Sequence, residues 1–165
     1  IVHPLCECKC KYSIYVILCK YMVKGDQISM ALDTKEVHSA WLQAERIIED
    51  RGSQYSVTAA RVTENKGVKA LLKRLTANKK YAKATHNSYA LRVERDGQIF
   101  ESKNDDGETG AGMVILRILR KQNATNVCVV VTRWYGGTKL YADRFKHVQD
   151  ATIHILNQSE LYQVS

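Results

Sequence analysis

The feature that most constrains the fold of this chain is the segment from Val127 to Thr132, an unbroken run of apolar and β-branched residues. Such a run is typical of a strand that is covered on both faces or lies at the centre of a sheet, because it offers no polar side to solvent. The glycine pair Gly136-Gly137 follows and interrupts the strand pattern. The chain is therefore expected to build a sheet around this strand.

The spacing of apolar residues on either side of this run predicts further strands and helices. One face of a predicted helix carries Val68, Leu71, Leu72 and Leu75. Asp96-Gly97 is typical of a two-residue hairpin turn between two predicted strands, 89–94 and 98–102. The other predicted elements are a strand over about 55–59, a helix over about 109–121, and a last helix capped by Asp143. From residue 53 on, the order β-α-β-β-α-β-α predicts a two-layer α+β domain with its helices on one face of the sheet.

The chain divides into an N-terminal segment, residues 1–49, to which we assign no role, and a domain over residues 50–160. Asp33 begins a capping-box spacing, and the apolar residues that follow it recur at helical intervals. A helix over about 35–49 is therefore expected, with Gly52 ending it.

The charge of the chain favours acidic partners. The formal net charge is +8, and between Lys66 and Lys83 there are seven basic residues and no acidic one. Most of these basic side chains fall opposite the apolar face of the predicted helix. Nucleic acid, acidic protein surfaces and anionic lipid all fit such an excess of charge, and charge alone does not choose among them.

Cysteine usage and hydropathy predict a cytoplasmic protein that does not enter a membrane. Four of the five cysteines lie in the N-terminal tail, whereas a fold built on disulfides would spread them through the domain. The apolar stretch over 12–23 is shorter than the roughly 20 residues that a membrane span needs.

An acidic loop, Asp105–Glu108, directly precedes a predicted helix. Its carboxylates are suited to capping the helix N-terminus, and clustered carboxylates also suit metal binding or acid–base work. His86 could form an acid–base pair with Asp105 or Glu108 across the fold, although a lone histidine is more often a hydrogen-bonded structural residue. The chain has no recognisable nucleophile setting, no pair of histidines at ligand spacing and no nucleotide-binding glycine loop, so we predict no catalytic residue, no metal and no cofactor.

The segment from Arg133 to Gly137 reads Arg-Trp-Tyr-Gly-Gly at the end of the predicted buried strand. Aromatic side chains among arginines and lysines make good recognition surfaces for proteins or single-stranded nucleic acid. The same aromatics also suit a structural role at the edge of the core.

Four blocks of sequence together resemble the Impact family, and specifically the Impact-type C-terminal domain of its eukaryotic branch. The blocks are Lys83–Ala90, Asn104–Gly112, Asn126–Gly137 and Asp143–His147, and they occur in the family's order over about residues 50–157. The chain departs from the family at Tyr141, where glycine is usual. Residues 1–49 also do not resemble the complete RWD domain that precedes this module in eukaryotic members.

The resemblance implies a fold like domain 2 of ribosomal protein S5, with a four-stranded sheet and helices on one face. It also implies a non-catalytic role. Eukaryotic members restrain the general-control kinase during amino-acid starvation by competing for its ribosome-associated activator, so that less initiation factor 2 is phosphorylated, and they associate with monomeric actin. The resemblance therefore implies a cytoplasmic repressor of a translational stress response that acts by protein binding.

Two sets of residues are predicted to carry this function. The partner-binding set comprises Lys66, Lys69, Lys73, Arg74, Lys80, Arg133, Tyr135, Lys139 and Arg144. The family-motif cluster comprises His86, Asn87, Asp105, Asp106, Gly107, Glu108, Gly136, Gly137 and Asp143. Two alternatives stay open: an RNA- or ribosome-binding module that uses the same lysines, and an undescribed enzyme that uses His86, the Asp105–Glu108 loop and Arg133.

Overall fold

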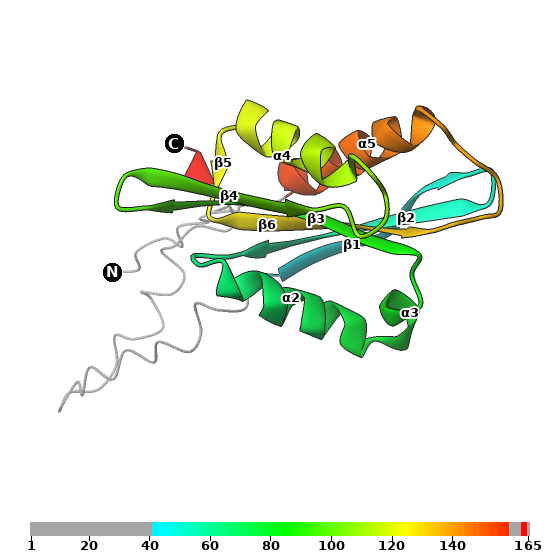
Figure 1. Cartoon of the computed structure of the whole chain (residues 1–165), viewed down its shortest axis with the longest axis horizontal. Coiled ribbons are helices and arrows are strands. Elements are labelled where there is room, and N and C mark those ends of the chain that lie inside the picture. The colour runs from blue at the N-terminus through cyan, green and yellow to red at the C-terminus, as the bar shows by residue number, and fades with distance from the viewer. Residues whose placement is uncertain (1–40, 159–162, 165) are drawn as a thin grey trace, which may run out of the picture. The chain divides into compact units, whose positions relative to one another are not determined.

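A computed structural model of the chain describes residues 41–158 and 163–164 (Figure 1). An antiparallel sheet with the order β1-β2-β6-β3-β4 is formed by β1 (Trp41–Asp50), β2 (Ser53–Arg61), β3 (His86–Arg95), β4 (Gln98–Asn104) and β6 (Val127–Trp134). The helices are α2 (Lys66–Ala77), α3 (Lys79–Ala82), α4 (Ala111–Lys121) and α5 (Asp143–Gln158). A separate two-stranded pair joins β5 (Ala124–Thr125) to β7 (Gln163–Val164). The α+β class is confirmed.

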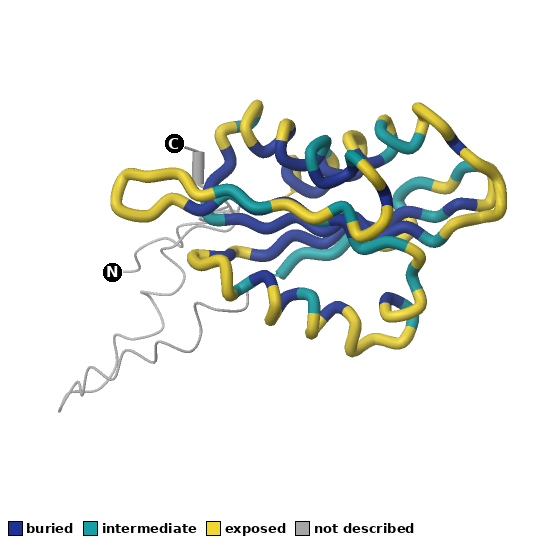
Figure 2. Tube along the Cα trace, in the orientation of Figure 1, coloured by how far each residue is buried: buried dark blue, intermediate teal, exposed yellow. Residues whose placement is uncertain are grey.

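The β-branched run forms β6, the central strand of the five, and β6 pairs with both β2 and β3. Its odd-numbered valines, from Val127 to Val131, pack into one apolar cluster with α4 and α5. Its even-numbered residues Cys128 and Val130 pack into a second cluster with α2. Both faces of the strand are therefore buried, as its sequence predicts (Figure 2).

The helices cover both faces of the sheet, so the prediction of helices on one face was wrong. Helices α4 and α5 lie on one face, and α2 and α3 lie on the other (Figure 1). Each face of β6 packs against a layer of helices, and this is why its side chains are apolar on both faces. Both alternatives that the strand pattern offered are therefore met, since β6 is central in the sheet and is covered on both faces.

Residues 41–49 of the predicted N-terminal helix form a strand instead, so the helix over 35–49 was wrong there; residues 35–40 lie outside the described residues. Strand β1 pairs with β2, but the register shifts between Ala44 and Ile48, where two extra residues bulge out of β1. Arg46, inside the bulge, has a φ of +48°. Because β1 joins the sheet as a fifth strand, the four-stranded prediction was also wrong, and the folded domain begins before residue 50.

Two hairpins have tight two-residue turns. Asp96 and Gly97 have positive φ values of 52° and 73°, as expected for the predicted turn between β3 and β4. Arg51 and Gly52 have φ values of 46° and 81° and join β1 to β2 in the same way. Gly52 therefore ends a strand and not a helix.

The other predicted elements are confirmed with small changes at their ends, among them the amphipathic α2, whose buried residues are Val68, Leu71 and Leu75. Within residues 41–158, none of the helices has the length and apolar character required to cross a membrane.

Candidate functional site

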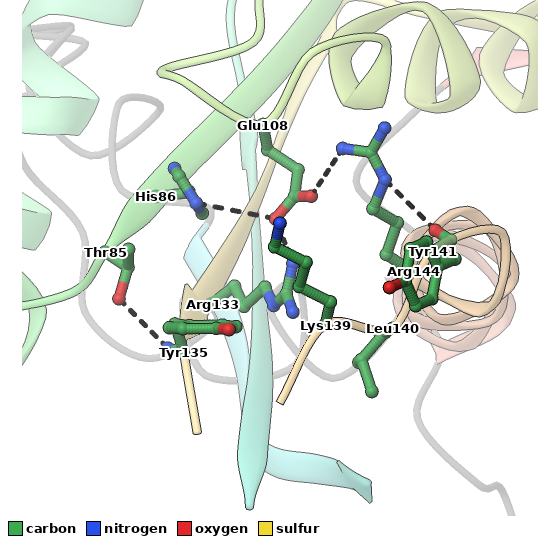
Figure 3. Close-up of a pocket in the computed structure, with 9 residues that line it drawn as sticks. All are labelled: Thr85, His86, Glu108, Arg133, Tyr135, Lys139, Leu140, Tyr141 and Arg144. Carbon is green, nitrogen blue, oxygen red and sulfur yellow. Dashed lines mark hydrogen bonds and ion pairs between the residues drawn. The ribbon is translucent and has the colours of Figure 1, made fainter. Parts of the chain in front are cut away.

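A pocket of about 560 Å³ opens where β6 ends (Figure 3). Its lining side chains come from the start of β3, the loop before α4, the end of β6, the loop after β6 and the first turn of α5. They are Thr85, His86, Glu108, Arg133, Tyr135, Lys139, Leu140, Tyr141 and Arg144. The volume lies within the roughly 300–1,000 Å³ typical of small-ligand sites.

Strand pairing brings the pocket residues together from distant parts of the sequence. In the antiparallel register of β3 and β6, His86 pairs with Arg133. The loop before α4 places Glu108 beside them, and the first turn of α5 adds Arg144. Six predicted residues, drawn from both predicted sets, therefore line one pocket: His86, Glu108, Arg133, Tyr135, Lys139 and Arg144.

The centre of the pocket is the carboxylate of Glu108, whose side chain is 5% exposed. Its Oε2 lies 2.5 Å from Nη1 of Arg133, and its Oε1 lies 2.8 Å from Nη1 of Arg144. Burial raises the pKa of Glu108, but the hydrogen bonds that Arg144 and Arg133 donate lower it by more, so the net pKa lies below its ordinary value. Glu108 is therefore held as a carboxylate.

His86 is oriented by the backbone of the acidic loop. Its Nδ1 lies 2.8 Å from the carbonyl oxygen of Asp106, and since a carbonyl only accepts, Nδ1 is the donor. The ring packs against Gly107, where an added Cβ would lie 3.2 Å from Nδ1. The other ring nitrogen, Nε2, faces Oε2 of Glu108 at 3.6 Å.

Arg133 is clamped between rings and polar groups. Its guanidinium carbon lies 5.5 Å from the ring centroid of Tyr55 and 5.4 Å from that of Tyr135. Besides its bond to Glu108, it donates from Nη2 to Oγ of Ser53 at 3.3 Å. Its Nε–H is buried and has no hydrogen-bond acceptor within the part of the chain that the structure describes. Arg133 is therefore rigidly placed and keeps one donor unused.

Acidification is expected to remove the contribution of Glu108 to stability. A carboxyl whose pKa is lower in the folded state than in the unfolded chain binds fewer protons when folded, so protonation favours unfolding. The contribution is complete above the ordinary pKa of 4.5 and is lost as the pH falls through the lower folded value. Urea denaturation at several pH values measures the unfolding free energy of the wild type and of Glu108→Gln. The difference between the two should become smaller as the pH is lowered. A difference that stays constant from neutral to acid pH would contradict the assignment.

The rest of the acidic loop is structural. Asp105 accepts from the backbone N–H groups of Gly110 at 2.9 Å and Gly112 at 2.8 Å, at the start of α4. Asp106 accepts from the backbone N–H of Asn87 at 2.7 Å. The capping prediction is thus confirmed for Asp105, whereas the carboxylate of Glu108 binds Arg133 and Arg144 instead of capping the helix. No group of three or more potential metal-ligating side chains (His, Cys, Asp or Glu) occurs within the described ranges.

The loop after β6 is fixed by contact with the first hairpin. The backbone N–H of Gly136 donates to Oγ of Ser53 at 3.2 Å. A Cβ at Gly136 would lie 2.0 Å from the carbonyl carbon of Gly52, so only glycine permits this approach. The hydroxyl of Tyr135 donates to the carbonyl of Gly137, and Asp143, in the first turn of α5, forms an ion pair with Arg51.

The predicted basic face is a separate surface on the opposite side of the sheet from α4 and α5. Lys66, Lys69 and Lys73 are exposed along α2 and form no ion pair with a described residue. Arg74 instead stacks 4.6 Å from the ring centroid of Trp41. Lys80 lies 2.7 Å from Glu45 in an ion pair. The partner-binding set therefore divides between α2 and α3 on one side of the sheet and the pocket, and it does not form one surface.

Three pocket residues were missed by the sequence analysis: Thr85, Leu140 and Tyr141. Thr85 and buried Leu140 carry no pattern that distinguishes them from ordinary structural residues. Tyr141 did carry a signal, since glycine is usual at this position in the resembled family. Its φ of +48° explains that preference, and its side chain, 75% exposed, stands at the mouth of the pocket.

Comparison with known proteins gives a family match over residues 51–156, to a model described as the Impact N-terminal domain. Protein IMPACT of Homo sapiens is 47% identical over 111 residues, which cover 66% of this chain and 35% of that protein. Protein IMPACT of Danio rerio is 42% identical over 113 residues, which cover 67% and 36%. The chain thus spans about a third of the length of these relatives.

Solved structures that are similar to this chain include the following two. One is that of the two-domain translational regulator Yih1, with 30% identity, a TM-score of 0.51, and coverage of 87% of this chain and 56% of that one. The other is a crystal structure of a hypothetical protein, with 21% identity and a TM-score of 0.64, covering 78% and 61%; it supports the fold alone. From the family match over most of the described domain, together with these relatives, we conclude that the chain belongs to the Impact family.

Proposed function

We propose that this domain is a non-catalytic, protein-binding module of a cytoplasmic translational regulator. Its partner is the ribosome-associated activator of the initiation factor 2α kinase, and binding it restrains that kinase during amino-acid starvation. Family membership supports the regulatory role, as does the likeness to the translational regulator Yih1. Monomeric actin is a second proposed partner.

The observation that carries this proposal is the basic face of α2, defined as Lys66, Lys69 and Lys73. These lysines recur every three or four residues on the side of the helix opposite buried Val68 and Leu75, so they point away from the core. Because no described carboxylate neutralises them, they are available to an acidic protein surface, where complementary charge steers association and excludes wrong partners.

Charge reversal on α2 tests this binding directly. The double variant Lys69→Glu/Lys73→Glu is expected to weaken binding to the purified activator at least about tenfold, since each reversal replaces an attraction with a repulsion. Fluorescence anisotropy with labelled activator measures the change. The matched control is Lys121→Glu/Lys146→Glu, which makes the same charge change at exposed positions on α4 and α5. Equal affinity of the wild type and the α2 variant would refute the proposal.

RNA or ribosome binding through the same lysines is the second candidate. Release of counterions from a phosphate backbone would make the affinity for RNA fall steeply as salt rises. Titration with single-stranded and duplex RNA at several salt concentrations distinguishes the candidates. A flat salt response, or no binding to RNA, counts against this one.

An enzymatic role has one observation in its favour, the convergence of His86, Glu108 and Arg133 in one pocket. Both oxygens of Glu108, however, are occupied by guanidinium groups that hold it ionised, so it is poorly suited to exchange a proton. Asp105 and Asp106 are engaged by backbone N–H groups outside the pocket. We therefore propose a binding role for this site as well.

A further inference from the structure

The pocket at the end of β6 carries an excess of positive charge. Its lining contains three cationic side chains, Arg133, Lys139 and Arg144, and one carboxylate, Glu108. With His86 counted as neutral, three positive charges against one negative charge leave an excess of two. Lys139 is exposed and makes no ion pair with any residue between 41 and 158. This excess of two positive charges matches a ligand with two negative charges better than a ligand with a single carboxylate.

The two arginines hold Glu108 and still have donors left. A guanidinium has five N–H donors in a planar fork. Arg144 uses Nη1 for Glu108 and Nε for the carbonyl of Tyr141, so its Nη2 group stays available among the described contacts. The Nε–H of Arg133 also lacks an acceptor there, but this nitrogen is fully buried, so Arg144 and the exposed Lys139 supply the donors that a ligand can reach.

Aromatic rings stand at the mouth of this cationic pocket. Tyr135 is 43% exposed and Tyr141 is 75% exposed, and both line the pocket with buried Leu140 (Figure 3). Tyr141 occupies a left-handed backbone position, at φ +48°, that would suit glycine better. This residue adds an exposed ring beside the cations, and a planar ring on a ligand could stack against it.

We propose that this pocket binds a phosphate monoester attached to an aromatic or heteroaromatic ring. A phosphate monoester carries about −1.5 to −2 charges at neutral pH, which matches the excess of two, and its oxygens suit arginine forks. Its ring contacts Tyr135 and Tyr141. This chemistry has two sources, a nucleoside monophosphate and phosphotyrosine, and the pocket does not depend on the α2 face proposed above.

The test uses the whole chain labelled with ¹⁵N and small probes. Phenyl phosphate is the minimal ligand, inorganic phosphate lacks the ring, and benzoate has the ring with a single negative charge. Titration of phenyl phosphate to about 10 mM is expected to shift the backbone signals of Thr85, Tyr135 and Arg144 and the Nε–H signal of Arg133. Phenyl phosphate should bind at least about tenfold more tightly than either other probe, a difference of about 1.4 kcal/mol.

Two variants separate the parts of the site without touching the buried ion pairs. Lys139→Ala is expected to weaken phenyl phosphate and inorganic phosphate alike, each by about five- to tenfold, because both lose a charged donor. Tyr141→Gly is expected to weaken phenyl phosphate alone, and glycine fits the backbone there. The matched control is Lys121→Ala, which removes one exposed lysine at the end of α4 outside the pocket and is expected to leave every affinity in this pocket unchanged.

Each outcome decides the proposal. Tighter binding of adenosine monophosphate than of phosphotyrosine supports it with a nucleotide source, and the reverse order supports it with a phosphotyrosine source. Benzoate binding as tightly as phenyl phosphate would overturn the choice of phosphate. Inorganic phosphate binding as tightly as phenyl phosphate would overturn the role of the rings. Absence of shifts at the pocket residues, with a folded spectrum, would overturn the site itself.

Discussion

Replacing Glu108 with glutamine is expected to lower the free energy of unfolding by about 3–5 kcal/mol, because it leaves a buried cation without its counter-charge. The side chain of Arg133 is only 7% exposed and cannot turn to solvent without leaving its place between Tyr55 and Tyr135. Arg144, at 28% exposed, can rehydrate more easily. Urea denaturation followed by circular dichroism measures the loss.

Glu101 provides a matched control, since it also bridges two arginines, Arg92 and Arg120, but at a more exposed position. Glu101→Gln is expected to cost about 1 kcal/mol or less, because water screens the pairs. Removing both buried partners, with Glu108→Leu and Arg133→Met, should cost less than Glu108→Gln alone. If Glu108→Gln and Glu101→Gln lowered the free energy of unfolding equally, burial would not explain the contribution of the Glu108 ion pairs to stability.

Gly136→Ala is expected to cost at least about 3 kcal/mol, at the upper end for overpacking. The added Cβ would lie 2.0 Å from the carbonyl carbon of Gly52 and 2.3 Å from the backbone nitrogen of Ser53. Both atoms belong to the backbone, so no side chain can move aside. The first hairpin and the end of β6 would have to separate, which would break the hydrogen bond from Gly136 to Ser53.

Gly67→Ala is the control for this substitution. Gly67 lies in the first turn of α2, and an added Cβ would be 3.1 Å from Cγ1 of Val62, a side-chain atom. Since alanine also favours the helix, the change in stability should stay within about 1 kcal/mol. Thermal and urea unfolding of both variants give the comparison. A loss at Gly136 no greater than that at Gly67 would mean that the hairpin and β6 can move apart freely.

The sequence predicted the elements whose periodicity is uninterrupted and missed β1, whose periodicity is interrupted, together with the short elements α3, β5 and β7. The strand over about 55–59, the helical face of α2 and the Asp96-Gly97 turn were all correct, although β2 is buried on both faces. In β1, Trp41 belongs to one core cluster and Leu42 and Ala44 to the other, as in a regular strand. The two bulged residues then bring Ile47 and Ile48 back to the same side, so the apolar spacing imitates a helix.

For the site, the sequence identified residue types but not which of them meet. His86, Glu108 and Arg133 belong to separate motifs, and only the register of β3 against β6 brings the first and last together. The sequence also did not distinguish basic residues that form ion pairs from basic residues that form none. Lys80 lies in the same basic run as Lys69, yet its partner Glu45 comes from β1, which the sequence analysis assigned to a helix. Sequence patterns cannot predict an ion pair when one of its residues belongs to an element that was assigned incorrectly.

The bulge in β1 also has a consequence for association between molecules. Strand β1 lies at the border of the sheet, where exposed N–H and C=O groups invite the backbone of another chain. The interruption between Ala44 and Ile48 divides that border into two short stretches, and the backbone N–H of Arg46 is taken up by Oγ of Ser56. Neither stretch is long enough to template an extended cross-strand pairing, so the irregularity that obscures β1 in the sequence also disfavours the addition of another chain at this border of the sheet.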